Sequence, residues 1–173
     1  GLAATKEAVE AQGVRAGSFS MDVTRSESVA EAVAAAAAAF GRIDVLVNNA
    51  GVNVRKPTLE LSEEEWDLVL DTNLKGYFLV ARAVVPHMIA RGRGKVINVS
   101  SIFGAVGMDN QLAYASSKGG VVQMTKVMAI EWARHGVNVN AIGPTYFETP
   151  LVAALRDDPE RFRFINERTP MGR

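Results

Sequence analysis

The alternation of apolar and polar segments along the chain predicts a regular succession of helices and strands. Short, nearly continuous apolar runs such as 43–47 are typical of strands that are buried on both faces of a parallel sheet. Segments with apolar residues three and four apart are typical of helices that bury one face. The predicted strands are 15–23, 43–47, 95–100 and 137–142, and the predicted helices are 5–12, 24–40, 62–91 and 111–135.

Residues with strong positional preferences mark where these helices begin and end. Ser62, with Glu65 three residues later, predicts a capping box at the start of the longest helix, and Thr24 or Ser26 is expected to cap the helix before it. Glycines are expected to end helices at positions 13, 41 and 136. The tail, 143–173, contains four prolines and is predicted to be a loop with one or two short helices.

The order of these elements predicts the fold class. Strands that alternate with helices indicate an α/β fold, a doubly wound parallel sheet with helices on both faces. In such sheets ligands bind beyond the C-terminal ends of the strands, and polar or glycine-bearing turns follow four strands here. We expect one domain over 1–173 in which these turns meet at one edge. The turns are Asp22-Val23, 48–51, Ser100-Ser101 and 144–149.

Composition and charge exclude several classes of protein. The formal net charge is zero, so nothing suggests nucleic acid or a membrane surface as a partner. The chain has no cysteine, which excludes disulfides and thiolate metal sites. His87 and His135 lie late in predicted helices, where a favourable interaction with the helix C-terminus explains them better than metal binding does. We expect no metal site, and a soluble, cytoplasmic protein.

The candidate chemistry is concentrated around Tyr114 and Lys118. Two residues four apart on a helix lie on the same face, and an ammonium near a phenol favours the phenolate. A tyrosine in this setting can give or take a proton near neutral pH. Ser101, on the loop before this helix, can donate a hydrogen bond to an oxygen held in front of the phenol. A lone pair of this kind is more often simply part of a solvated helix face.

Asn73 is a second candidate because it lies within the apolar stripe of the helix predicted at 62–91. A buried amide lowers stability unless it is hydrogen-bonded. Asn73 therefore either bonds a neighbouring backbone segment or takes part in function, and this segment alone does not distinguish the two.

Taken together and in this order, these motifs resemble the short-chain dehydrogenase/reductase family. Ser101 lies 13 residues before Tyr114, a spacing that fits the family, and the resemblance covers nearly the whole chain. The matching motifs are Asp22-Val23, NNAG at 48–51, Asn73, the IxNxSS-like 97–101, YxxxK at 114–118, and NAIGP at 140–144 with Thr149.

The resemblance implies a Rossmann-like fold and a catalytic tetrad of Asn73, Ser101, Tyr114 and Lys118. In this reading Tyr114 exchanges a proton with the substrate oxygen, and Ser101 orients and polarises that oxygen. Lys118 favours the phenolate and binds the nicotinamide ribose, and Asn73 holds a water that links Lys118 to solvent.

The resemblance also implies a binding site for NAD or NADP, which supplies the hydride chemistry. Asp22 and Val23 would border the adenine, and Asn49, Ala50 and Gly51 would lie along its ribose. Pro144, Phe147 and Thr149 would lie near the nicotinamide, together with Tyr114 and Lys118.

The chain departs from the family pattern in two ways. Thr145 follows Pro144 where the family usually has glycine, a residue that allows close backbone approach or positive φ. The glycine-rich loop, the first two strands and the last strand of the family pattern are expected to be absent. We therefore expect a fragment that binds dinucleotide weakly by itself, since the pyrophosphate site at a helix N-terminus would be missing.

The resemblance implies an NAD(P)-dependent oxidoreductase that interconverts a secondary alcohol and a ketone. The stretch 141–151 is most similar to sugar-acid dehydrogenases of the gluconate 5-dehydrogenase kind, with 3-oxoacyl-carrier-protein reductases close behind. The alternative is a catalytically silent dinucleotide-binding module or sensor on the same fold. The family also implies a homo-oligomer, a dimer or homotetramer, assembled through the two long helices.

Overall fold

The computed structural model describes residues 2–146 and 159–171. The chain divides into two compact units, Gly1–Gly143 and Pro144–Arg173. The first unit contains the sheet and the helices that cover it, and the second contains one described helix, α7 (Pro159–Glu167).

Three parallel strands form the sheet of the first unit. They are β1 (Val45–Asn48), β2 (Gly94–Val99) and β3 (Val137–Ile142), in the order β1-β2-β3. Val47 is in register with Ile97, which in turn is in register with Asn140. The predicted strands at 43–47, 95–100 and 137–142 are therefore confirmed to within two residues at their ends. The parallel α/β class is confirmed as well.

The helices of the first unit follow the predicted order. They are α1 (Leu2–Glu10), α2 (Ser26–Phe40), η1 (Thr58–Glu60), α3 (Glu63–Leu70), η2 (Asp71–Lys75), α4 (Gly76–Ile89), η3 (Ile102–Gly104) and α5 (Leu112–Ala133). Gly41 ends α2 with a φ of 78°, and Gly136 follows α5 with a φ of 72°. Both are left-handed backbone conformations that favour glycine, so these two predicted stops are confirmed.

The predicted long helix at 62–91 is a continuous helical segment with a change of pitch in its middle. Ser62 and Glu65 form the predicted capping box, in which each side chain bonds the other residue's backbone N–H. Helix α3 then passes into a π-helical turn, η2, before α4 resumes α-helical geometry. Single π turns within α-helices occur frequently at functional sites.

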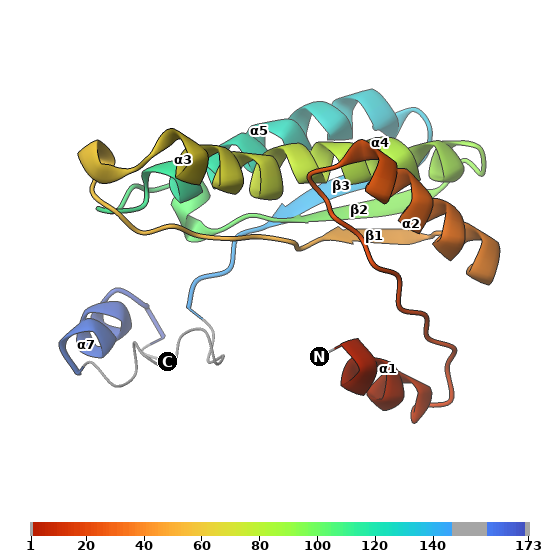
Figure 1. Ribbon diagram of the computed structural model, residues 1–173, viewed down its shortest axis with the longest axis horizontal. Coiled ribbons are helices and arrows are strands. Elements are labelled where there is room, and N and C mark those ends of the chain that lie inside the picture. The colour runs from red at the N-terminus through yellow and green to blue at the C-terminus, as the bar shows by residue number, and fades with distance from the viewer. Residues whose placement is uncertain (1, 147–158, 172–173) are drawn as a thin grey trace. The chain divides into compact units, whose positions relative to one another are not determined.

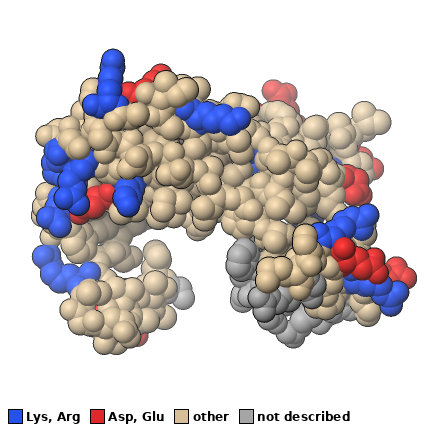
Figure 2. Space-filling view, turned by 180° about the vertical axis from the view of Figure 1, so that it is seen from behind, with Lys and Arg blue, Asp and Glu red and all other residues tan. Residues whose placement is uncertain are grey.

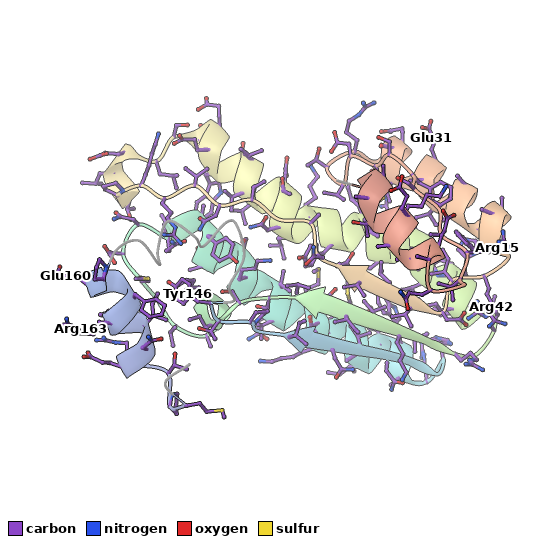
Figure 3. All side chains as sticks on the ribbon, turned by 90° about the horizontal axis from the view of Figure 1, so that it is seen from below. Arg15, Glu31, Arg42, Tyr146, Glu160 and Arg163 are labelled. Carbon is purple, nitrogen blue, oxygen red and sulfur yellow. The ribbon has the colours of Figure 1, made fainter. Side chains whose placement is uncertain are left out.

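The strand predicted at 15–23 is wrong. Residues 14–22 are irregular in the described structure. The described sheet has the order β1-β2-β3, and none of its strands pairs with this segment. Arg15 instead donates a hydrogen bond to Ala39 O (2.7 Å) and lies over the Phe40 ring at the end of α2 (Figure 3).

The predicted cap of α2 is also wrong. The N-cap is Arg25, with no side-chain capping bond, because the Thr24 hydroxyl donates to Asp22 Oδ1 instead (2.7 Å).

The core lies between one face of the sheet and the helices above it (Figure 1). Alternate residues of β1 differ sharply: Asn48 is buried, whereas Val45 and Val47 are 50% and 53% exposed. The expectation that this strand is buried on both faces is therefore wrong for the described residues, because α4 and α5 pack against the same face. The fully buried core side chains include Val29, Tyr77, Val85, Met88, Val96 and Val137.

Candidate functional site

The expected convergence of turns at one sheet edge is found for two strands. Parallel strands place their C-terminal ends at the same edge, so the turn after β1, at 49–51, lies on the same side as Ser100 and Ser101 after β2. The first turns of α5 return to this edge, because the Ser100 hydroxyl donates to Lys118 O (3.0 Å). Segments that lie far apart in the sequence thus surround Lys118.

Asn73 is completely buried in the π turn η2, and its amide makes three hydrogen bonds. Its Oδ1 accepts from Val52 N (2.8 Å), and its Nδ2 donates to Val52 O (2.9 Å) and to Ser117 Oγ (3.1 Å). The amide therefore fixes the turn after β1 against α5. Bonding to a neighbouring backbone segment, one of the two expectations for Asn73, is what the structure shows.

Lys118 is 3% exposed, and its ammonium lies in a pocket of aromatic rings and carbonyl oxygen. Nζ donates to Val99 O (2.7 Å) and to the Tyr77 hydroxyl (3.4 Å). Nζ also lies 5.2 Å from the centroid of the Tyr77 ring and 5.6 Å from that of Tyr114. Burial disfavours the charged amine and lowers the pKa of Lys118 to about 8.

Tyr114 is half-buried in the first turn of α5, where neighbours hold its ring and backbone. Phe103 packs edge-on against the ring, with centroids 6.4 Å apart, and the Ser117 hydroxyl donates to Tyr114 O (2.8 Å). The predicted pairing of Tyr114 with Lys118 on one helix face is therefore present. The alternative of a solvated helix face does not fit, since Lys118 is buried.

Ser101 caps the short helix η3, and its Oγ accepts a hydrogen bond from Phe103 N (3.2 Å). Because Phe103 packs on Tyr114, the Ser101 loop and the tyrosine are held against each other. A hydroxyl that accepts one bond keeps its own proton free to donate to a substrate oxygen.

Gly104 allows this loop to approach α5 closely. A Cβ at this position would lie 2.6 Å from Ser100 Oγ and 2.9 Å from Lys118 O, distances that side-chain carbons do not tolerate. The loop that carries Ser101 therefore has its position fixed by a glycine and by the Ser100 bond.

The turn after β1 presents exposed backbone beside Lys118. Asn49, Ala50 and Gly51 are all exposed, and a Cβ on Gly51 would lie 3.8 Å from Lys118 Nζ and 3.4 Å from Asn73 Oδ1. A phenol, an ammonium and accessible backbone groups form a set of donors and acceptors that fits the hydroxyls of a ribose. The residues present therefore fit the ribose groups of a dinucleotide.

Asp22 and Val23 lie in the turn before α2. Val23 packs against Gly76 at the start of α4. A Cβ added to Gly76 would lie 2.9 Å from Val23 Cγ2. Asp22 is exposed, and hydrogen bonds from the Thr24 hydroxyl and backbone lower the pKa of its carboxyl. Of the remaining predicted residues, Phe147 and Thr149 lie outside the described residues, and Pro144 belongs to the second unit.

Sequence reasoning missed several residues of the site. Tyr77 bonds Lys118, Ser117 bonds Asn73, and the buried Gln111 accepts from Asn53 Nδ2 (3.0 Å) three residues before Tyr114. The only signal was a polar group at a position expected to be apolar, the same signal that singled out Asn73. Tyr77 lacked even this sequence signal, because tyrosine is common in apolar stripes.

A buried polar chain supports the sheet below the site. Asn48 Nδ2 donates to Asn98 Oδ1 (2.9 Å), and Asn98 Nδ2 donates to Thr125 Oγ1 (2.9 Å). This chain joins β1, β2 and α5. It fixes the strands from which the site loops emerge.

Comparison with known proteins identifies the class to which this fold and site belong. The family model described as short chain dehydrogenase matches residues 1–160. The chain belongs to the short-chain dehydrogenase/reductase family, and it is an NAD(P)-dependent oxidoreductase that interconverts a secondary alcohol and a ketone.

Individual relatives are similar over nearly the whole chain. It is 39% identical over 172 residues to the gluconate 5-dehydrogenase of Gluconobacter oxydans (strain 621H), covering 99% of this chain and 67% of that protein. It is 41% identical over 167 residues to the 3-oxoacyl-[acyl-carrier-protein] reductase of Thermotoga maritima, covering 95% of this chain and 67% of that protein.

A solved structure gives the same result. The crystal structure of a gluconate 5-dehydrogenase from Burkholderia cenocepacia J2315, in complex with NADP and tartrate, superimposes with a TM-score of 0.93 at 39% identity. The match covers 98% of this chain and 67% of that one. The chain thus spans about two thirds of the length of the proteins it resembles.

Proposed function

We propose that Tyr114, Ser101, Lys118 and Asn73 carry the oxidoreductase chemistry of this protein. The observation that supports this assignment best is the position of the Lys118 ammonium. It is buried, has no carboxylate partner among the described ion pairs, and lies 5.6 Å from the centre of the Tyr114 ring. The ammonium therefore lies beside the phenol that we propose to exchange the substrate proton.

Each side chain has a defined task in the reaction. In alcohol oxidation the Tyr114 oxygen takes the hydroxyl proton of the substrate, and in ketone reduction it returns that proton to the carbonyl oxygen. The Ser101 hydroxyl donates a hydrogen bond to the same substrate oxygen and holds it before the phenol. Asn73 fixes the turn after β1 and orders a water that connects Lys118 to solvent. The nicotinamide, when bound, supplies or accepts the hydride.

The dinucleotide contacts follow the family pattern. Asp22 and Val23 border the adenine, and the exposed backbone at 49–51 follows its ribose. Tyr114 and Lys118 bind the nicotinamide ribose. At the nicotinamide end we assign Pro144, Phe147 and Thr149, the last as a donor to the carboxamide.

For the substrate we infer a sugar acid or a related polyol. A gluconate 5-dehydrogenase from Gluconobacter oxydans is among the relatives, and the exposed amide of Asn53 is held by the buried Gln111, three residues before Tyr114. Amides suit the hydroxyls of a polyol, because each offers both donors and acceptors. A 3-oxoacyl thioester is the second candidate, supported by the similarity to the Thermotoga maritima reductase.

The protein is further proposed to act in the cytoplasm as a homo-oligomer, a dimer or tetramer, through α4 and α5. Phe78, Val127 and Ile130 are 44%, 54% and 78% exposed on these helices, and a shallow hollow lies between Phe78 and Trp132. Exposed apolar patches of this kind favour association.

Figure 2 shows a face with a broad uncharged area and charges of both signs mainly toward its margins. None of the described helices is long and apolar enough to cross a membrane.

The test of this function is a spectrophotometric assay. The purified protein is mixed with NADH or NADPH and a panel of 5-keto sugar acids and 3-oxoacyl thioesters, and the reduced-nicotinamide absorbance is followed. We expect turnover that Tyr114→Phe removes, with the highest kcat/KM for a keto sugar acid. Dinucleotide binding without turnover on any ketone would instead favour a silent binding module.

A further inference from the structure

The hydroxyl group of Tyr77 contacts the same ammonium that the reaction needs. Tyr77 is 1% exposed on α4, and its OH donates to Val99 O (3.1 Å) while accepting from Lys118 Nζ (3.4 Å). Nζ donates to the same carbonyl (2.7 Å). Val99 O, the phenol oxygen and Nζ therefore form a closed triangle at the C-terminal end of β2.

We propose that Tyr77 is a positioning residue, whose hydroxyl orients the Lys118 ammonium beside Tyr114 and helps keep it charged. This role rests on the proposed function, because it matters only if Lys118 supports the Tyr114 phenolate.

The geometry favours this role over simple satisfaction of a backbone carbonyl. Lys118 already donates to Val99 O at the shorter distance, so the carbonyl does not depend on the phenol. The phenol oxygen donates to that carbonyl and also accepts from Nζ at 3.4 Å. The ring of Tyr77 adds a second favourable contact, since Nζ lies 5.2 Å from its centroid.

The electrostatic surroundings make this hydroxyl important. Two titratable groups face Nζ among the described residues, the phenols of Tyr77 and Tyr114, and none of the described ion pairs includes Lys118. Burial raises the pKa of Tyr77 to about 12, so this phenol stays neutral at every working pH. Its oxygen is thus a fixed acceptor for a buried cation that has few others.

The proposal is tested with Tyr77→Phe, which keeps the ring and removes only the hydroxyl. The pKa of Lys118 is measured by NMR on protein labelled at the lysine side chains, without cofactor. Loss of an acceptor for the charged form should lower the pKa of Lys118 by about 0.5 relative to the wild type. In the presence of NADH or NADPH, the dissociation constant should rise more at pH 8 than at pH 6.5.

Thr125→Val is the matched control. It also removes one buried hydroxyl, the acceptor of the Asn98 bond, but does not touch Lys118. It should lower thermal stability about as much as Tyr77→Phe and leave the pKa of Lys118 unchanged.

An unchanged pKa of Lys118 in Tyr77→Phe, or an equal change in Thr125→Val, would overturn the proposal. The pKa of Lys118 is measured without turnover, so the test of the Tyr77 proposal is independent of the test of the proposed function. A wild-type protein without activity but with the expected pKa change would contradict the proposed function and leave the contact between Tyr77 and Lys118 established.

Discussion

At the scale of single residues, the site depends on one buried lysine with two phenols around it. Lys118 donates hydrogen bonds to a backbone carbonyl and to the Tyr77 hydroxyl. Its ammonium also lies near the ring of Tyr114, which is partly exposed. A cation in this position is unfavourable for folding and useful for chemistry. The same burial that lowers its pKa strengthens its electrostatic interaction with neighbouring groups.

The roles of Tyr114 and Lys118 are separable by substitution. Tyr114→Phe removes the exchangeable proton and keeps the ring, so turnover should fall by about 10²-fold or more while dinucleotide affinity stays nearly unchanged. Lys118→Met removes a charge that contacts both phenol and ribose, so it should lower turnover and weaken dinucleotide binding together. Steady-state kinetics and calorimetry check both. Wild-type turnover in Tyr114→Phe would refute the mechanism.

Lys118 should also leave a mark on the pH dependence of stability. Its pKa is about 8 in the folded protein and about 10.5 when unfolded, so the folded state carries the full penalty of a buried charge below pH 8. Above pH 8 the folded protein releases a proton that the unfolded chain retains, and stability from this group rises until about pH 10.5.

Lys118→Met should therefore be more stable than the wild type at pH 7, by about 1–3 kcal/mol before lost hydrogen bonds are counted. The difference should shrink as the pH rises from 8 to 10. Urea unfolding at several pH values measures it. A difference that stayed constant with pH would contradict the assigned penalty.

At the scale of elements, the site is built from close contacts between loops and helices. The π turn η2 holds Asn73 between the turn after β1 and α5, and Ser100 ties the next loop to Lys118 O. These bonds fix the distance between the Ser101 loop and the tyrosine helix. Small changes in backbone separation there should affect catalysis more than equal changes elsewhere.

Gly104→Ala tests this coupling. The new Cβ would be 2.6 Å from Ser100 Oγ and 2.9 Å from Lys118 O, so the loop must move away from α5. We expect a loss of about 1–3 kcal/mol in stability and a marked fall in kcat. Gly107→Ala, in the same loop but with no atom within 4 Å of the added Cβ, is the control and should retain activity. Equal kcat values for the two variants would argue against a loop fixed by Gly104.

At the scale of the whole molecule, the exposed apolar surface of α4 and α5 is the feature that favours association with another copy of the chain. Ile130 is 78% exposed, and Phe78 and Val127 lie on the same pair of helices. These exposed side chains do not contribute to packing against the sheet, because Val121 and Met128 are the residues buried on the inner face of α5.

Ile130→Glu should therefore shift the protein toward monomer at micromolar concentration without unfolding it, as a buried charge opposes association. Sedimentation velocity measures the shift. Leu59→Glu, at a 99% exposed position on η1, is the control and should leave the assembly unchanged. Identical sedimentation of Ile130→Glu and the wild type would argue against this interface.

The amino-acid sequence by itself determined the elements that depend on local physics. The capping box at Ser62 and the stops at Gly41 and Gly136 involve only neighbouring residues, and continuous apolar runs are sufficient to indicate where strands lie, though not which of their faces are covered. The family motif also fixed Tyr114 and Lys118 on one helix face. Each of these features is local in the chain, so no knowledge of packing was needed.

Only the tertiary structure decided which partners those residues meet. Residues 15–23 have strand-like sequence, but a strand exists only beside another strand, and none of the described strands pairs with them. Tyr77 looked like an ordinary core residue until packing brought its hydroxyl to Lys118, 41 positions away. Hydrogen bonds and burial between distant segments depend on where the backbone returns in space, and that is the physical reason why such contacts could not be inferred from local pattern.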